Sequence, residues 1–334
     1  MSRPIRIAVD AMGGDDAPEA IVAGALKAAG DEIEPILVGR LGIDPKGLAH
    51  VVADQVIDMH EKPSKAIRVK SRSSLVVAHR LVAEGKADAV VSAGNTGAML
   101  AAGLVVLRRL PGVRRPAIAV VMPSRQGPYV LIDGGANADA RPRHLLQFAH
   151  MGATFAEEIL GLKNPSVRLL SIGEEAEKGN VLSVATHKLL AASSLNFAGN
   201  AEGRLLLEHP ADVIVCDGFT GNIAVKTVEG TAGSMFRALR EAVDESAVSK
   251  LGGLLLRPAL RSVREKFNPD TYGGAYLLGL RGLSVIAHGN SSPDAIANAI
   301  RLAARGAEHR VVQRIAERMP SRVVASARPS NSTE

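Results

Sequence analysis

Only one cysteine, Cys216, occurs among the 334 residues, so the chain cannot form an internal disulfide. Proteins without disulfides are typical of reducing compartments, and we expect a cytoplasmic protein. The hydrophobic fraction of 46% excludes a disordered chain and is enough for a sizeable core. The length fits one large α/β domain or two smaller ones.

Aromatic residues are scarce as well, with no Trp, three Tyr and six Phe. Proteins that bind single-stranded nucleic acid stack bases on aromatic side chains, and this chain also lacks a long run of Lys and Arg. We therefore expect no nucleic-acid partner. The net charge of +6 favours another anionic partner, such as phosphate, an anionic lipid or an acidic protein.

Several functional signatures are missing. No apolar signal segment precedes the first predicted strand at Ile5, and no apolar run approaches the roughly 18 residues of a membrane span, so any membrane contact should be peripheral. The phosphate-binding loop G-x-x-x-x-G-K-[ST] and the dinucleotide motif G-x-G-x-x-G with its distant acidic residue are both absent. Because no His-x-x-His or paired-cysteine spacing occurs, we expect no metal and no cofactor.

What the chain does contain is a regular alternation of short β-branched runs with helical patterns. This order predicts a three-layer α/β/α fold whose sheet is mostly parallel and covered on both faces. The predicted strands are Ile5–Asp10, Pro35–Gly39, Gln55–Met59, Ala89–Ser92, Ala117–Met122, Tyr129–Ile132, Val167–Ile172, Val213–Cys216 and Leu283–Ala287. The predicted helices are Glu19–Ala29, Ser74–Glu84, Thr96–Arg108, Pro142–Leu160, Val181–Ala191, Asn222–Asp244 and Asp294–Arg318.

Glycine-rich polar clusters follow the ends of five predicted strands. Each cluster alone could be an ordinary turn with a helix cap, but together they favour a shared ligand-binding rim at the carboxyl ends of the strands. The clusters are residues 92–97, 133–137, 173–180, 217–222 and 288–292.

A sixth segment, Ala11–Pro18, joins the first strand to the first helix and contains two adjacent glycines. Glycine amides and a helix N-terminus can bind an anion, which would place Asp10, Gly13 and Gly14 at a phosphate. The carboxylates of Asp10, Asp15 and Asp16 oppose a bare anion, so an ordinary turn with a cap is the alternative.

Five segments together resemble the PlsX family of bacterial phosphate acyltransferases of phospholipid synthesis, and the match runs in order to about Gln313. They are DAMGGDDAP at 10–18, ADAVVSAGNTGA at 87–98, the loop 173–180, ADVIVCDGFTGN at 211–222 and YGGAYLLGLRGLSVIAHGNSS at 272–292. The resemblance implies an isocitrate dehydrogenase/phosphotransacetylase-like fold. It also implies transfer of a long acyl group from acyl carrier protein to inorganic phosphate, forming acyl phosphate for glycerol-3-phosphate acylation.

The same resemblance implies a homodimer attached peripherally to the inner face of the cell membrane, with a glycerol-3-phosphate acyltransferase as a further partner. Attack of phosphate on a thioester needs an anion site beside the carbonyl and donors for the oxyanion, but no Ser-His-Asp triad. We expect catalytic roles for Lys178, Asn222, His288 and Asp217. We expect phosphate or substrate to be bound by Asp10, Gly13, Gly14, Gly94, Asn95, Thr96, Gly97, Asn137, Gly218 and Gly221.

Three of these interpretations have a simpler alternative. Lys178 could be a solvated surface lysine, and His288, which precedes a glycine, could be a structural cap. Cys216 could suggest a covalent acyl-enzyme, but it ends an apolar run and has no basic neighbour to lower the pKa of its thiol. We therefore expect direct catalysis.

A leucine-rich segment interrupts the α/β pattern near residues 235–267. Leu251, Leu254, Leu255 and Leu256 are bracketed by Lys250, Arg257, Arg261, Arg264 and Lys266, which is typical of a helical hairpin that inserts leucines among anionic lipid headgroups. A dimer interface or ordinary core packing is the alternative. We expect residues 1–319 to form one domain that includes this hairpin, and 320–334 a flexible tail.

Two functions from other classes remain open at this point. A nicotinamide-dependent dehydrogenase on a related fold would need a dinucleotide site, for which the sequence shows no motif. A non-catalytic membrane scaffold for lipid-synthesis enzymes would need the apolar tip but no anion-binding rim. Calorimetric titration with NAD(P) and mutation of the rim would separate these hypotheses.

Overall fold

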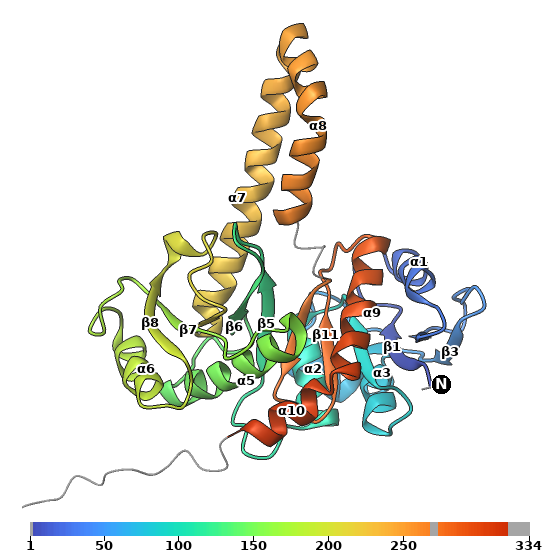
Figure 1. Ribbon diagram of the computed structural model, residues 1–334. Coiled ribbons are helices and arrows are strands. Elements are labelled where there is room, and N and C mark those ends of the chain that lie inside the picture. The colour runs from blue at the N-terminus through green and yellow to red at the C-terminus, as the bar shows by residue number, and fades with distance from the viewer. Residues whose placement is uncertain (1–2, 268–272, 320–334) are drawn as a thin grey trace, which may run out of the picture.

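The computed structural model describes residues 3–267 and 273–319, so the predicted flexible tail 320–334 lies outside the described residues. An 11-stranded sheet runs through the whole body, and helices cover both of its faces (Figure 1). The strand order is β3-β2-β1-β4-β11-β10-β5-β6-β9-β7-β8. The predicted three-layer α/β architecture with a mostly parallel sheet is confirmed.

One half of the sheet is parallel and begins with the first strand of the chain. Its strands are β1 (Ile5–Asp10), β2 (Ile33–Gly39), β3 (Ala49–Val52), β4 (Ala89–Ser92) and β11 (Leu283–Ile286). Ile7 and Val9 face α1 (Glu19–Ala28) and α9 (Pro293–Glu308), whereas Ala8 faces α3 (Ser74–Ala83). Because alternate residues of a strand point to opposite faces, a sheet with helices on both faces needs strands in which every residue is apolar.

The other half of the sheet is also parallel but runs in the opposite direction. Its strands are β6 (Tyr129–Ile132), β9 (Val213–Val215), β7 (Val167–Ser171) and β8 (Phe197–Glu202), packed by α5 (Pro142–Leu160) and α6 (Val181–Ala191). Two antiparallel strands, β5 (Ala117–Met122) and β10 (Ala275–Leu278), separate the halves and reverse the direction.

This reversal corrects the expectation of one shared rim. The clusters 92–97 and 288–292 follow β4 and β11, but 133–137, 173–180 and 217–222 follow strands that run the other way. The carboxyl ends of the strands in one half therefore lie at the same end of the sheet as the amino ends of the strands in the other half. Only loops beside the central strands can meet, across the face of β5.

Predicted and observed elements differ where the polypeptide is polar or the helix is interrupted. Residues 55–59 are not a strand, since Gln55 makes only an isolated bridge to Ser73, and β3, β8 and β10 were not predicted. The predicted helix 96–108 is α4 (Thr96–Ala102) followed by the π-helix η1 (Gly103–Leu107). The predicted helix 294–318 is broken into α9 and α10 (Val311–Arg318) at Arg310, which has a left-handed backbone with φ of 53°.

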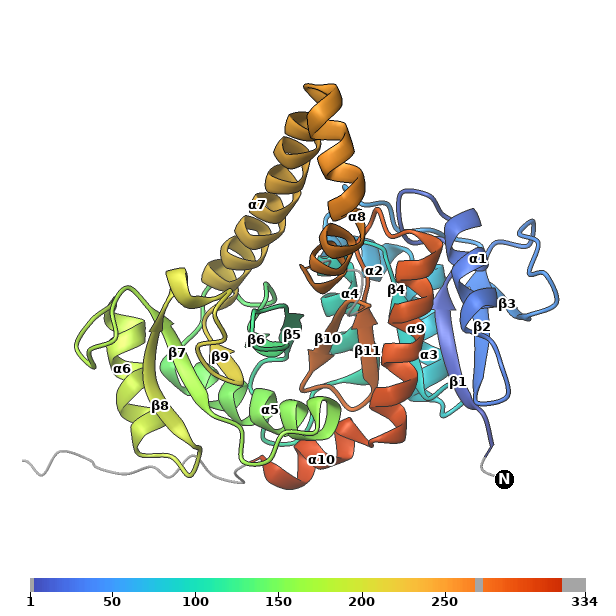
Figure 2. The ribbon, with the colours of Figure 1, turned by 45° about the horizontal axis from the view of Figure 1, so that its top comes forward.

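The remaining elements are α2 (Pro63–Val69), which packs on α4, the short helix η2 (Gly203–Leu205), and two long helices, α7 (Gly218–Asp244) and α8 (Ala247–Phe267). α7 and α8 form a hairpin that projects from the body in both ribbon views (Figures 1 and 2). A Cβ on Gly253 would lie 2.5 Å from a methyl of Val243, so glycine lets the two helices approach.

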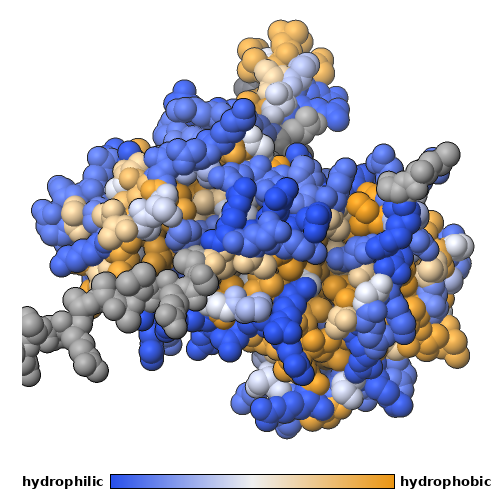
Figure 3. Space-filling model, turned by 60° about the horizontal axis from the view of Figure 1, so that its bottom comes forward, coloured by the Kyte–Doolittle hydropathy of each residue, from blue (hydrophilic) through white to orange (hydrophobic). Residues whose placement is uncertain are grey.

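The far end of this hairpin is apolar on its surface, as the orange tip in Figure 3 shows. The exposed fractions of Leu251, Leu254, Leu255 and Leu256 are 62%, 62%, 76% and 58%. Within residues 3–267 and 273–319, no helix combines the length and the apolar character needed to cross a bilayer. The tip leucines are therefore outside the core that this chain builds by itself.

His79 of α3 should make the fold sensitive to acid. Its side chain is fully buried, Nδ1 lies 2.8 Å from the Leu75 carbonyl oxygen, and Nε2 has no hydrogen-bond partner. Burial lowers the pKa of His79 from 6.5 to about 4. Below pH 6.5 the His79 side chain binds a proton in the unfolded chain but stays neutral in the folded protein. The contribution of the neutral His79 to the unfolding free energy is therefore fully present above pH 6.5 and is lost as the pH falls toward 4.

Between pH 7 and pH 5 this linkage should lower the unfolding free energy by about 2 kcal/mol. The measurement is urea unfolding of the wild type and of His79→Leu at both pH values. On going from pH 7 to pH 5, the unfolding free energy of the variant should fall by about 2 kcal/mol less than that of the wild type. Identical losses in the two proteins would contradict the prediction.

Candidate active site

A cleft of about 410 Å³ lies over the face of β5, between α4 and α7. Figure 2 shows these two helices on opposite sides of β5. The side chains along the middle of the cleft are largely apolar, whereas its ends are formed by glycine loops and polar side chains. The apolar residues include Leu100, Ile118, Val120, Met122, Pro123, Val225, Val228 and Ile286. The polar ends include Gly94, Thr96, Gly97, Gly134, Gly135, Asn222, Lys226, Glu229, His288 and Gly289.

The sequence-predicted residues that line this cleft are Gly94, Thr96, Gly97, Asn222 and His288. Thr96 and Gly97 begin α4, where first-turn N–H groups have no partner within the helix and are available to an anion. Asn222 donates from Nδ2 to the Gly134 carbonyl oxygen at 3.4 Å. The cleft therefore joins loops from both halves of the sheet.

A layer of buried carboxylates lies behind these loops. Asp10, which is 3% exposed, accepts a hydrogen bond from Ser92 Oγ at 2.7 Å, and Ser92 Oγ in turn accepts from the Gly94 amide at 3.0 Å. Burial raises the pKa of Asp10, although hydrogen bonds from Ser74, Ser92 and Met12 oppose that shift. A Cβ on Gly13 would lie 2.8 Å from the Gly94 nitrogen. Asp10 and Gly13 thus position the Gly94 loop from outside the cleft.

Asp133 plays the same part in the second half of the sheet. This fully buried carboxylate accepts hydrogen bonds from the amides of Ile118, Gly135, Ala136 and Asn137 at 2.8 to 3.1 Å. It also accepts a bond at 2.8 Å from the side-chain amide of Asn137. Asp133 belongs to the predicted cluster 133–137 but was not among the predicted site residues, although its position directly after a buried strand was an available signal.

The start of α7 packs directly on this loop. The Gly218 amide donates to the Asn137 carbonyl oxygen at 2.8 Å, and a Cβ on Gly221 would lie 2.0 Å from the Asp133 carbonyl oxygen. Asp217 caps the helix by accepting from the Thr220 amide at 2.9 Å and from Thr220 Oγ1 at 2.8 Å. These contacts fix Asn222, one turn further along, at the cleft.

Three charged or titratable side chains meet at the other end of the cleft. Lys226 Nζ lies 3.1 Å from Oε2 of Glu229, and His288 Nε2 lies 3.4 Å from Oε1 of the same carboxylate. Burial alone would raise the pKa of Glu229, but hydrogen bonds from His288 and Lys226 outweigh it and lower the pKa. Sequence reasoning missed Lys226 and Glu229, although their spacing from Asn222 places all three on one face of α7.

Four other predicted site residues lie away from the cleft surface. Lys178 is exposed in the loop after β7 and Gly14 lies in the turn after β1, and neither lines the cleft. Asn95 accepts from the Ala98 amide at 3.0 Å and donates to the Met59 carbonyl oxygen at 2.8 Å, so its side chain caps α4 and anchors the 59–61 loop. Asn137 is buried and donates to the Pro116 carbonyl oxygen.

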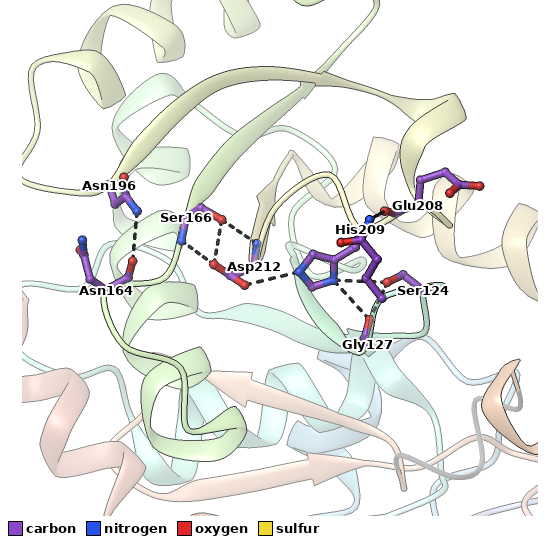
Figure 4. Close-up of polar contacts among 9 residues, drawn as sticks. Ser124, Gly127, Asn164, Ser166, Asn196, Glu208, His209 and Asp212 are labelled. Atoms are coloured by element: carbon purple, nitrogen blue, oxygen red, sulfur yellow. Dashed lines mark hydrogen bonds and ion pairs between the residues drawn. The ribbon is translucent and has the colours of Figure 1, made fainter.

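A Ser–His–Asp arrangement occurs outside the cleft (Figure 4). His209 Nδ1 lies 3.2 Å from Ser124 Oγ, and His209 Nε2 lies 3.4 Å from Asp212 Oδ1. Ser124 is only 1% exposed and its hydroxyl donates to the Gly127 carbonyl oxygen, so it is not available as a nucleophile. The cluster instead holds the turn after β5.

Cys216 lies beneath the cleft and should be dispensable. It is 2% exposed, and burial, together with the nearby charges of Asp133 and Asp217, raises the pKa of its thiol well above the ordinary value. Cys216→Ser should keep most of the activity, because a neutral buried thiol is a poor nucleophile. Mass spectrometry during turnover should find no acyl adduct, and a stable acyl group on Cys216 would reverse this prediction. In the described part of the chain, no three His, Cys, Asp or Glu side chains are grouped to hold a metal ion.

Comparison with known proteins identifies relatives over nearly the full length. The sequence model of a family described as "Fatty acid synthesis protein" matches residues 5–314. A phosphate acyltransferase of Desulfitobacterium hafniense is 48% identical over 327 residues, covering 95% of this chain and 98% of that protein. A phosphate acyltransferase of Heliobacterium modesticaldum is 46% identical over 331 residues, covering 96% and 99%.

Solved structures support the fold at much lower sequence identity. The EutD phosphotransacetylase from Staphylococcus aureus superposes with a TM-score of 0.57 at 18% identity, covering 91% of this chain and 94% of that chain. A phosphotransacetylase from Streptococcus pyogenes gives a TM-score of 0.59 at 19% identity with the same coverage. At this identity the likeness concerns the fold alone.

Proposed function

Because this chain belongs to the fatty acid synthesis protein family and is nearly half identical to phosphate acyltransferases, we propose that it moves a fatty acyl group from acyl carrier protein to inorganic phosphate. The product is acyl phosphate for phospholipid synthesis. The observation that carries the proposal is the cleft itself, which places an apolar trough beside unpartnered helix amides, Asn222, Lys226 and His288. An acyl chain suits the trough, and phosphate suits the polar ends.

The chemistry needs little beyond positioning. An oxygen of hydrogen phosphate attacks the thioester carbonyl, the new C–O bond forms, the C–S bond breaks, and the proton lost by phosphate ends on the thiol that leaves. We propose that the amides of Thr96 and Gly97 and the Asn222 side chain bind phosphate or the oxyanion. Lys226 supplies positive charge, and His288 is placed to carry the proton to sulfur.

The direct test is incubation with palmitoyl-carrier protein and phosphate, with acyl phosphate trapped by hydroxylamine. Hydroxylamine also reacts slowly with the thioester itself, so the signal is the hydroxamate formed above that background, which should require both the protein and phosphate. The test of the site is Asn222→Ala, which removes a hydrogen-bond donor at the cleft and leaves the buried carboxylates in place. This variant should form less hydroxamate than the wild type. A wild type that adds no phosphate-dependent hydroxamate to the background would contradict the proposed function, and undiminished formation in the variant would contradict the proposed site.

Membership of this family also supports proposals about the partners of the protein. We propose a homodimer that attaches to anionic membrane on the inner face of the cell membrane and passes acyl phosphate to a glycerol-3-phosphate acyltransferase. The exposed leucines at the hairpin tip, with Lys250 and Arg257 exposed beside them, support the membrane contact.

A further inference from the structure

Six exposed arginines form a continuous surface at the end of the helix that leads away from the cleft. Arg281 donates from Nε to the Arg109 carbonyl oxygen at 3.2 Å, and a guanidinium nitrogen of Arg109 donates to the Arg114 carbonyl oxygen. These contacts orient the side chains of Arg281 and Arg109. The six residues, called here the arginine face, are Arg108, Arg109, Arg114, Arg115, Arg141 and Arg281.

The arginine face is not neutralised within the part of the chain that the structure describes. No carboxylate of residues 3–267 and 273–319 lies within ion-pair distance of any of the six, whereas other basic residues, such as Arg3 with Asp88, are paired. Their combined charge also affects a neighbour. The pKa of His144 is lowered first by burial and then by Arg115, Arg141 and Arg114. The surface is therefore locally positive and open to an anionic partner.

Arg108 itself occupies an unusual backbone conformation. Its φ of 64° and ψ of 165° belong to a region used almost only by glycine, so a residue with a side chain is strained there. The Arg108 amide donates to the Gly103 carbonyl oxygen, and the Arg281 amide donates to the Arg108 carbonyl oxygen, each at 2.9 Å. A glycine would fit here without strain. An arginine in its place indicates a use for the side chain.

The arginine face adjoins the helix that forms one wall of the cleft. Leu100 lines the cleft, and Leu104, about 6 Å further along the helix, lines an open hollow together with Arg108 and Arg109. Both leucines pack on the same hydrophobic cluster as Val120. A partner seated on the arginines would thus lie beside the α4–η1 segment that also lines the cleft.

We propose that the arginine face docks the acidic protein that carries the acyl thioester, and that the acyl chain reaches the cleft along the α4–η1 wall. This inference rests on the proposed function. Guanidinium groups suit the task because each can hold a carboxylate through two parallel hydrogen bonds, and rim charges mainly govern encounter and register. The face is a docking surface and takes no part in the reaction.

The test compares two donors, palmitoyl-carrier protein and a palmitoyl thioester of a small thiol. Arg114→Ala/Arg115→Ala should raise KM for the carrier-bound donor about 10-fold and leave the kinetics of the small thioester unchanged. Arg108→Gly should raise the same KM while its thermal midpoint is no lower than that of the wild type, since the strain is removed. The charge-matched control is Lys163→Ala/Lys188→Ala, at exposed positions after the end of α5 and in α6, which should behave like the wild type.

The outcomes separate this inference from the proposed function. A wild type that forms acyl phosphate from neither donor would refute the function. An active wild type whose arginine variants keep the KM for the carrier-bound donor, or lose both donors equally, would overturn the docking surface alone. Variants that instead lose binding to phosphatidylglycerol vesicles, with carrier kinetics intact, would also overturn it and assign the arginines to lipid.

Discussion

Lys226→Ala should lower kcat/KM for phosphate by about 100-fold, an effect typical of a lost charge-stabilising group in an active site. Lys226 lines the cleft and its side chain is 56% exposed, so its removal should have little effect on folding. Without it, the carboxylate of Glu229 would face the phosphate site with only His288 to offset its charge. The repulsion should weaken phosphate binding as well as slow the reaction.

The measurement is the phosphate dependence of hydroxamate formation at saturating acyl donor. Lys226→Arg, which keeps the charge, should recover part of the activity, because charge rather than packing is at stake. Lys178→Ala is the informative comparison, since the sequence predicted a catalytic role for Lys178 and the cleft does not contain it. A phosphate dependence that is normal in Lys226→Ala and impaired in Lys178→Ala would move the phosphate site to the loop after β7.

The difference between these two lysines shows what the sequence could and could not predict. β4, β5, β6, α5 and α6 have the predicted bounds, because unbroken apolar runs and capped amphipathic stretches decide local structure. β8 was missed because its sequence, FAGNAE, contains a glycine and two polar residues, so neither period nor β-branched content marks it as a strand.

The site depended on topology that no local pattern contains. The glycine clusters after β4, β6, β9 and β11 were found from the sequence, but the reversal at β10 and β5 decides which of them meet. Cluster 173–180, with Lys178, follows β7 and ends beyond the cleft. Lys226 and Glu229 were missed because charges along a long helix usually face solvent, and only the position of α7 across the face of β5 brings them to the site.

The hairpin gives the second large effect: Leu254→Glu/Leu255→Glu should abolish sedimentation with phosphatidylglycerol vesicles and leave acyl-phosphate synthesis in solution intact. Each cation near the surface contributes on the order of 1 kcal/mol and each fully buried leucine about 1.5–3 kcal/mol, so neither contribution alone holds the protein firmly. Glutamates remove the insertion and repel the anionic lipid at the same time. Both leucines are more than half exposed, which should spare the fold.

The matched control is Ile172→Glu/Val181→Glu, which adds the same charge at apolar positions 81% and 89% exposed, just after β7 and at the start of α6. It should sediment like the wild type, because these positions lie outside the hairpin and the leucines next to Ile172, Leu169 and Leu170, are buried. The oligomeric state of each variant is measured by analytical ultracentrifugation. If the leucine variant unfolds or dissociates into monomers, the tip belongs to a subunit interface and the membrane proposal is wrong. If it stays folded and active but no longer binds vesicles, the exposed leucines are what attach this acyltransferase to lipid.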